Sequence, residues 1–153
     1  MKLQTSNSKF QIPNSNLQPP TSNFQLPTSN LQPASMNVEP VVLTGRHVRL
    51  EPVTPDHVPG LFNVGNDPEI WRYMPYGQID SLEKMRALIE EMGKRRANGT
   101  DMPFVAIHLE SNSPAGCTRY MDIQPAHRGL EIGGTWYGTP YRRTVVNTEC
   151  KYL

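Results

Sequence analysis

Three consecutive seven-residue units, NSNLQPP, TSNFQLP and TSNLQPA, occupy residues 14–34 and limit what the N-terminal part of the chain can fold into. A seven-residue period is typical of a coiled coil. However, the prolines that end the first two units remove helix hydrogen bonds and clash with the preceding turn, at a cost of about 3 kcal/mol each. Polar units with so few apolar side chains cannot offset the entropy of ordering the chain. We therefore predict a disordered, low-complexity leader over residues 1–36.

Two interpretations of this leader stay open. It is either a linker or peptide ligand, or a short DNA repeat upstream of the gene that has been translated, in which case Met36 is the natural start. A mitochondrial presequence is excluded because the leader contains no arginine.

The remaining 117 residues are enough for one modest domain, which we place at residues 41–153. The whole chain has a net charge of +1, and the leader contributes Lys2 and Lys9 without any acid. The rest therefore has 13 basic and 14 acidic residues, a net charge of −1 that predicts neither nucleic acid nor an anionic membrane as a partner. No apolar stretch approaches the roughly 20 residues that span a bilayer, so we expect a soluble domain.

The cysteines and histidines do not indicate a disulfide framework, a metal site or a nucleophile. Cys117 and Cys150 are the only cysteines and have no recognisable base beside them in the sequence. The four histidines lack metal-ligand spacing. We expect no metal and a reducing, cytoplasmic setting.

Hydrophobic periodicity predicts one strand and two helices in the first half of the domain. Residues 46–53 alternate as a strand does, and Thr54-Pro55-Asp56 is typical of a helix start. Asp80 with Glu83 resembles a capping box, and the apolar residues that follow fall on one helix face: Leu82, Met85, Leu88, Ile89 and Met92. Asn98-Gly99 closes this second helix.

Three strands follow in the second half. Residues 103–110 and 117–125 predict a hairpin around the turn at 111–116, and residues 127–138 predict a third strand. The paired glycines Gly133-Gly134 inside this strand indicate a bulge or a close approach by another group. We therefore predict an α+β fold with a mainly antiparallel sheet and two or three helices.

The segment 139–153 combines turn residues, two arginines and the beginning of a helix. The first amides of a helix lack internal partners and lie at the positive end of its dipole, so such a corner can bind an anion. Arg142 and Arg143 add charge there. The spacing alone also fits two arginines at a solvated turn.

Residues 41–153 resemble the N-terminal part of a GCN5-related N-acetyltransferase, in the branch that includes the ribosomal-protein alanine acetyltransferases. The resemblance rests on LTGRHVRLEPVTPDHVPGLF, NDPEIWRYMP and above all LEIGGTWYGTPYRRTVVNTECKYL. It implies an acyl-CoA N-acyltransferase fold, of which this chain has the early part, and acetyl-CoA as the acetyl donor. Members of the family continue beyond the position that corresponds to Leu153.

The resemblance also implies site residues. The strand at 129–138 donates backbone groups to the donor at Thr135 and Tyr137. The family's pyrophosphate loop, Gln/Arg-x-x-Gly-x-Gly/Ala, falls on residues 142–147, with both glycines replaced. The implied cofactor-binding residues of this corner are Arg142, Arg143, Thr144, Val145, Val146, Asn147 and Thr148.

Glu131 is the candidate catalytic base that the resemblance implies. In related enzymes a carboxylate on this strand takes a proton from the substrate ammonium, and it suits the role if partial burial raises its pKa toward neutrality. The alternative is a structural glutamate that pairs with Arg119 or Arg128. Trp136 and the side chain of Tyr137 are expected to pack rather than contact substrate.

The expected function is acetyl transfer from acetyl-CoA to a primary amine, either a protein N-terminus or a small molecule. We expect this activity to be compromised in the chain because the second half of the family's site lies beyond Leu153. The alternatives are a catalytically inactive truncated fragment or interaction module, and a small anion-binding module built on Arg142 and Arg143. An unpaired edge of the strand at 129–138 predicts self-association.

Overall fold

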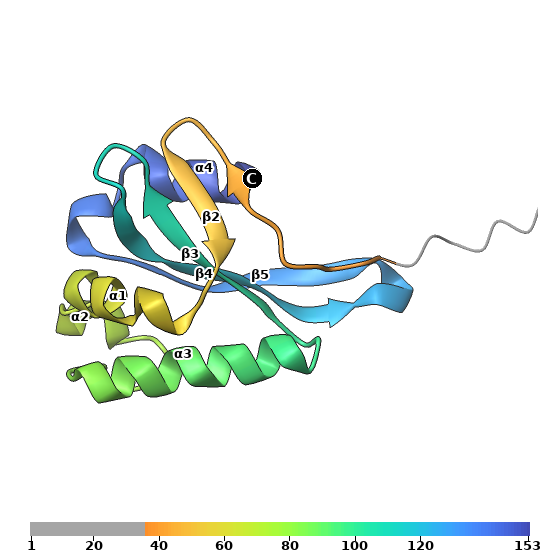
Figure 1. The fold of residues 1–153 in the computed structure, drawn as a ribbon, viewed down its shortest axis with the longest axis horizontal. Helices are drawn as coiled ribbons and strands as arrows, with labels where there is room; N and C mark the ends of the chain where they lie inside the picture. Colours follow the sequence, from red (N-terminus) through yellow and green to blue (C-terminus); the bar gives the residue numbers. More distant parts are fainter. Residues whose placement is uncertain (1–35) are drawn as a thin grey trace, which may run out of the picture. The chain divides into compact units, whose positions relative to one another are not determined.

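The computed structural model describes residues 36–153, which form one five-stranded sheet with helices on both faces (Figure 1). The strands are β1 (Leu43–Thr44), β2 (Val48–Pro52), β3 (Met102–His108), β4 (Ser113–Gln124) and β5 (Gly129–Tyr137), and the helices are α1 (Val58–Val64), α2 (Pro68–Trp71), α3 (Leu82–Ala97) and α4 (Val145–Tyr152). The predicted leader lies outside the described residues except for Met36.

The sheet has the order β1-β2-β3-β4-β5, and every neighbouring pair is antiparallel. This confirms the predicted α+β class and the order of strand, helices and three antiparallel strands. Strand β5 is the last in the sheet, so its outer edge has no partner among residues 36–153. Self-association through that edge stays a prediction.

Helix starts follow the expected chemistry, with one correction. Thr54 is the N-cap of the turn that leads into α1, as predicted. The N-cap of α3 is Ser81, whose hydroxyl accepts from the amide of Lys84 at 3.2 Å, and not Asp80. Asp80 instead forms an ion pair with Lys84 at 2.7 Å, because its carboxylate lies one residue too early to cap the helix. Helix α2, where no helix was predicted, begins at the Asp67 cap.

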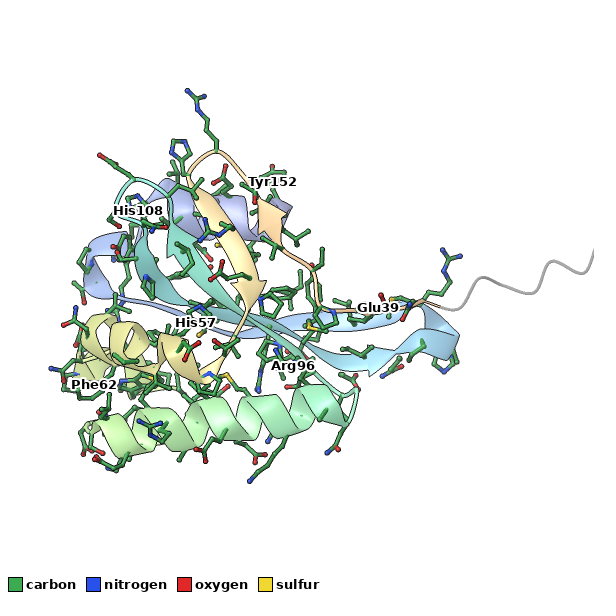
Figure 2. The ribbon with its side chains drawn as sticks, viewed as in Figure 1. Glu39, His57, Phe62, Arg96, His108 and Tyr152 are labelled. Atoms are coloured by element: carbon green, nitrogen blue, oxygen red, sulfur yellow. The ribbon has the colours of Figure 1, made fainter. Side chains whose placement is uncertain are left out.

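Two hydrophobic clusters hold the helices on opposite faces of the sheet. The first contains the predicted stripe of α3 and the two tryptophans Trp71 and Trp136, whose rings lie 5.0 Å apart. The second contains Val146 and Cys150 of α4 with residues of β2 and β3. Phe62 of α1 packs against the first cluster, whereas Tyr152 lies on α4, on the other side of the sheet (Figure 2).

Both cysteines are buried and free. Burial raises the pKa of Cys117 to about 12, which keeps the thiol protonated and unreactive at neutral pH. Among the described residues, no group of three His, Cys, Asp or Glu side chains could hold a metal ion. None of the helices in residues 36–153 is both long and apolar enough to cross a membrane.

Glu149 ties α4 to the turn between β1 and β2. Its carboxylate accepts from three successive backbone amides, those of Arg46, His47 and Val48, each at 2.7 Å. Gly45 allows this approach, because a Cβ at that position would lie 2.6 Å from the Glu149 carboxyl carbon. Burial alone raises the pKa of Glu149, but the three amide donors outweigh it and the net pKa is lowered from 4.5.

We predict that Glu149→Gln lowers the free energy of unfolding by about 1–3 kcal/mol at neutral pH, because one amide oxygen replaces a carboxylate that accepts three hydrogen bonds. Since the folded pKa lies below 4.5, this stabilisation is present above pH 4.5 and is lost as the pH falls through the folded pKa. The difference in the free energy of unfolding between the wild type and the variant should therefore become smaller in acid. Urea denaturation at several pH values measures it.

Glu90→Gln is the matched control, since Glu90 is exposed on α3. Equal stability of the two variants at neutral pH would contradict the role given to Glu149.

Candidate functional site

A β-bulge in β5 determines which side chains face which helices. Cys117 of β4 pairs with Trp136, and Arg119 pairs with Gly133, so two steps along β4 correspond to three along β5. Gly134 has a φ of +56°, the left-handed conformation that such a bulge requires. The bulge predicted from Gly133-Gly134 is therefore confirmed.

The extra residue changes the alternation of side chains along β5. Before the bulge, Ile132 pairs with Tyr120 on the α4 face, so Glu131 points to the opposite face with α1, α2 and α3. After the bulge, Trp136 belongs to the α1–α3 cluster and Tyr137 to the α4 cluster. Glu131 and Tyr137, six residues apart, therefore lie on opposite faces of the strand.

An ion pair lies against the bulge on the α1–α3 face. Arg119 and Asp101 are both 6% exposed in their side chains, and Arg119 Nη1 lies 3.0 Å from Asp101 Oδ2, although the pair does not have hydrogen-bond geometry. The Arg119 guanidinium also lies 5.8 Å from the centre of the Tyr76 ring. A Cβ on Gly134 would be 2.6 Å from Arg119 Nε and 3.0 Å from Tyr76 Oη. Glycine is therefore required here by both conformation and space.

On the α4 face, a chain of hydroxyl groups joins three elements. Thr135 Oγ1 lies 2.8 Å from Thr118 Oγ1 of β4. Lys151 of α4 donates from Nζ to Thr135 Oγ1 at 2.9 Å. Partial removal from water lowers the pKa of Lys151.

The corner between β5 and α4 positions Arg142 and Arg143. Arg142 Nε donates to the carbonyl of Tyr137 at 3.2 Å, and its Nη1 lies 3.7 Å from Asp67 Oδ2. A hydrogen bond from Thr139 is the largest cause that lowers the pKa of Asp67, so this carboxylate stays charged beside Arg142. Arg143 has a φ of +58°, which is uncommon for a residue with a side chain.

Helix α4 begins within the segment 139–153, where the sequence predicted the beginning of a helix. Thr144 is the N-cap: its hydroxyl accepts from the amide of Val146 at 3.3 Å and donates to the carbonyl of Tyr141 at 2.7 Å. The remaining amides of the first turn have no acceptor within the helix, so this end of α4 attracts anions.

A cavity of about 440 Å³ opens beside this helix start. Its lining residues come from α2, β5, the corner and α4: Ile70, Thr135, Trp136, Tyr137, Arg142, Arg143, Asn147 and Lys151. Three of these are cationic and none is acidic, so the cavity suits a polyanion with an uncharged part.

The cavity brings together five of the predicted cofactor-binding residues: Thr135, Tyr137, Arg142, Arg143 and Asn147. The other four lie at the helix start without lining it. Thr144 is the cap, Val145 is 54% exposed, Val146 is buried in the α4 cluster and Thr148 is exposed.

Glu131 does not line the cavity and is exposed. It forms no ion pair within residues 36–153, since Arg119 pairs with Asp101. The structure therefore does not show the alternative pairing with Arg119 or Arg128, and the catalytic role stays a prediction.

The sequence analysis missed three of the lining residues: Lys151, Ile70 and Trp136, the last of which it expected only to pack. Lys151 had a detectable signal, because it lies four residues after Asn147 and therefore on the same helix face. Nothing local in the sequence marks Ile70, which reaches the cavity from α2 through the tertiary fold.

Comparisons with known proteins agree with this arrangement. A family model described as an acetyltransferase (GNAT) domain matches residues 47–152. A comparison with curated protein sequences finds no match.

Three solved structures illustrate the likeness. A GCN5-related N-acetyltransferase from Brucella melitensis is 24% identical with a TM-score of 0.71, and the match covers 78% of this chain and 54% of that one. A protein from T. thermophilus assigned as an acetyltransferase is 29% identical with a TM-score of 0.66, over 77% and 60%. RimL, a ribosomal L7/L12 α-N-protein acetyltransferase in complex with coenzyme A, is 17% identical with a TM-score of 0.58, over 71% and 62%.

The chain thus spans between 54% and 62% of the length of these three structures. The likeness confirms the expected acyl-CoA N-acyltransferase fold.

We predict that Gly134→Ala lowers the free energy of unfolding by more than Gly99→Ala does. Gly99 has a similar φ, +72°, but a Cβ there would meet nothing within 4 Å. In both variants the left-handed conformation of the new alanine should therefore lower the free energy of unfolding by about 1–2 kcal/mol. Gly134→Ala should lose about 1–3 kcal/mol more, because Arg119 is buried and cannot move aside. Urea denaturation compares the two, and equal losses would contradict the close packing of Arg119 against the bulge.

Proposed function

The chain belongs to the GNAT acetyltransferase family, and on this premise we propose that it is an acetyl-CoA-dependent N-acetyltransferase that acts on a primary amine. The observation that best supports this proposal is the cavity at the start of α4. It is lined by Arg142, Arg143 and Lys151 and by no acidic residue. Acetyl-CoA, when bound, supplies the acetyl group as a thioester.

The residues of the cavity suit the two chemically different parts of such a donor. Arg142 and Arg143, together with the first amides of α4, would hold the diphosphate by charge and hydrogen bonds. Thr135 and Tyr137, which carry no charge, line the cavity along β5. Val145, at a position of a family glycine, is 54% exposed and does not line the cavity, so it leaves room for the ligand.

Glu131 would act from the opposite face of β5. It accepts a proton from the ammonium group of the acceptor, directly or through a water, so that the amine nitrogen can attack the thioester carbonyl carbon. The nitrogen–carbon bond forms, the carbon–sulfur bond breaks, and the leaving thiolate takes the second proton that the nitrogen loses, which gives the amide and the coenzyme A thiol.

The acceptor in this proposal is a primary amine, a protein N-terminus or a small molecule. RimL, which shares the fold, is a ribosomal L7/L12 α-N-protein acetyltransferase, and this favours a protein N-terminus. The described cavity contains no feature that selects one acceptor over the other.

We predict that the double variant Arg142→Ala, Arg143→Ala weakens acetyl-CoA binding by about tenfold or more, since each hydrogen bond to a charged group contributes about 1.5–3 kcal/mol. Isothermal titration calorimetry measures the dissociation constant, and the loss should be smaller at high salt because both arginines are exposed. Arg86→Ala, an exposed arginine on α3, is the control and should bind as the wild type does. Identical affinities of all three proteins would refute the diphosphate site.

Glu131→Gln should lower the rate of acetyl transfer about 10²- to 10⁴-fold while the affinity for acetyl-CoA stays unchanged, as expected for loss of a general base. Release of the coenzyme A thiol with a primary amine as acceptor gives the rate. Glu110→Gln, at an exposed position in the β3–β4 turn, is the control. A variant at position 131 that keeps the wild-type rate would exclude this glutamate as the base.

A second candidate function is donor binding without acetyl transfer. The exposure of Glu131, which forms no ion pair within the described range, favours it, because a catalytic carboxylate is usually held in place by neighbours. A wild-type chain that binds acetyl-CoA but releases no thiol in the presence of amines would support this function over the first.

A further inference from the structure

Lys151 lines the cavity and is cationic. It belongs neither to the family's pyrophosphate loop nor to the proposed diphosphate contact. Its ammonium nitrogen lies 2.9 Å from Thr135 Oγ1 and 3.5 Å from Thr118 Oγ1. Within residues 36–153, it forms no ion pair with a carboxylate. An exposed lysine normally extends into water, whereas this one is turned back onto two hydroxyl groups of the sheet.

Lys151 has one N–H donor that its contacts with Thr135 and Thr118 do not use. A lysine ammonium has three N–H donors, and the contacts of Lys151 with the two threonine hydroxyls occupy two of them. The hydroxyls, 2.8 Å apart, also share one hydrogen bond between themselves. The third donor of Lys151 is therefore available to a ligand in the cavity that the lysine lines.

The position of Lys151 along the cavity indicates which part of a ligand it meets. Asn147 and Lys151 both line the cavity and lie four residues apart on α4, a rise of about 6 Å away from the helix start. On the strand side, Thr135 lies two residues, or about 7 Å, before Tyr137, whose carbonyl holds Arg142. Lys151 with Thr135 thus forms one end of the cavity, and Arg142 with Tyr137 forms the other.

We propose that Lys151 is a specificity-determining residue that donates a hydrogen bond to a carbonyl oxygen in the uncharged arm of the acyl donor, and so distinguishes an acyl-CoA from a nucleotide that has only the diphosphate. This inference rests on the proposed function, since it assumes that the donor binds in this cavity. Thr135 and Thr118 hold the ammonium group toward the ligand. The lowered pKa of Lys151 agrees with an ammonium that is partly removed from water before a ligand arrives.

The test is a calorimetric titration of the full chain with two probes, acetyl-CoA and ADP. Lys151→Met keeps the length and helix propensity of the side chain but removes its donors. It should weaken acetyl-CoA binding about tenfold and leave ADP binding within about twofold of the wild type. Arg142→Ala, in contrast, should weaken both probes. ADP binding serves at the same time as the control for folding.

Three results would overturn the inference: unchanged acetyl-CoA affinity of Lys151→Met, an equal loss for both probes in a folded protein, or an ADP-specific loss. If Lys151→Met does not fold, Thr135→Val decides the question, because it removes the hydroxyl that holds the ammonium group and should reduce acetyl-CoA affinity alone. A wild-type chain that binds neither probe would instead refute the proposed function.

Discussion

The extra residue in β5 is the constraint on which the rest of the site depends. A strand without a bulge would turn residues 131, 135 and 137 to one face, because side chains alternate with a period of two. With the bulge, Glu131 faces α1–α3 while Tyr137 packs beneath α4. The two faces of β5 can then serve different parts of the proposed site. The cost is a left-handed backbone at Gly134, where Arg119 and Tyr76 fill the space that a side chain would need.

Helix α4 completes this site only because it is fixed at several points. Val146 and Cys150 bury its apolar face, and Glu149 binds three amides of the β1–β2 turn. An isolated eight-residue helix is unstable in water, so these contacts rather than helix propensity maintain it. The same contacts set the rotation of the helix about its axis. Asn147 and Lys151 therefore face the cavity while Glu149 faces away toward β2.

Local patterns in the sequence predicted most of the secondary structure and part of the site. Alternation in residues 46–53, the stripe of α3 and the glycine pair each express a rule that acts over a few residues, and each was confirmed. Contacts between distant residues were not predictable. Glu149 and Arg46 are 103 positions apart, and the choice of Asp101 as the partner of Arg119 depends on how β3 and β4 pair. The cap at Ser81 shows the limit even locally, since two adjacent residues could each have capped α3.

In the proposed diphosphate site, the helix start would bind an anion without the two glycines of the family's loop. Glycine lets a ligand approach backbone amides closely, and Val145 and Asn147 occupy the two family glycine positions. Val145 is exposed and does not line the cavity, whereas Asn147 lines it and has a side-chain amide that can donate hydrogen bonds. Arg142 and Arg143 add two full charges to a helix dipole equivalent to about half a charge. Anion binding in the proposed site would therefore depend mainly on the two arginines, and it would tolerate side chains at positions where a loop that binds through backbone amides alone needs glycine.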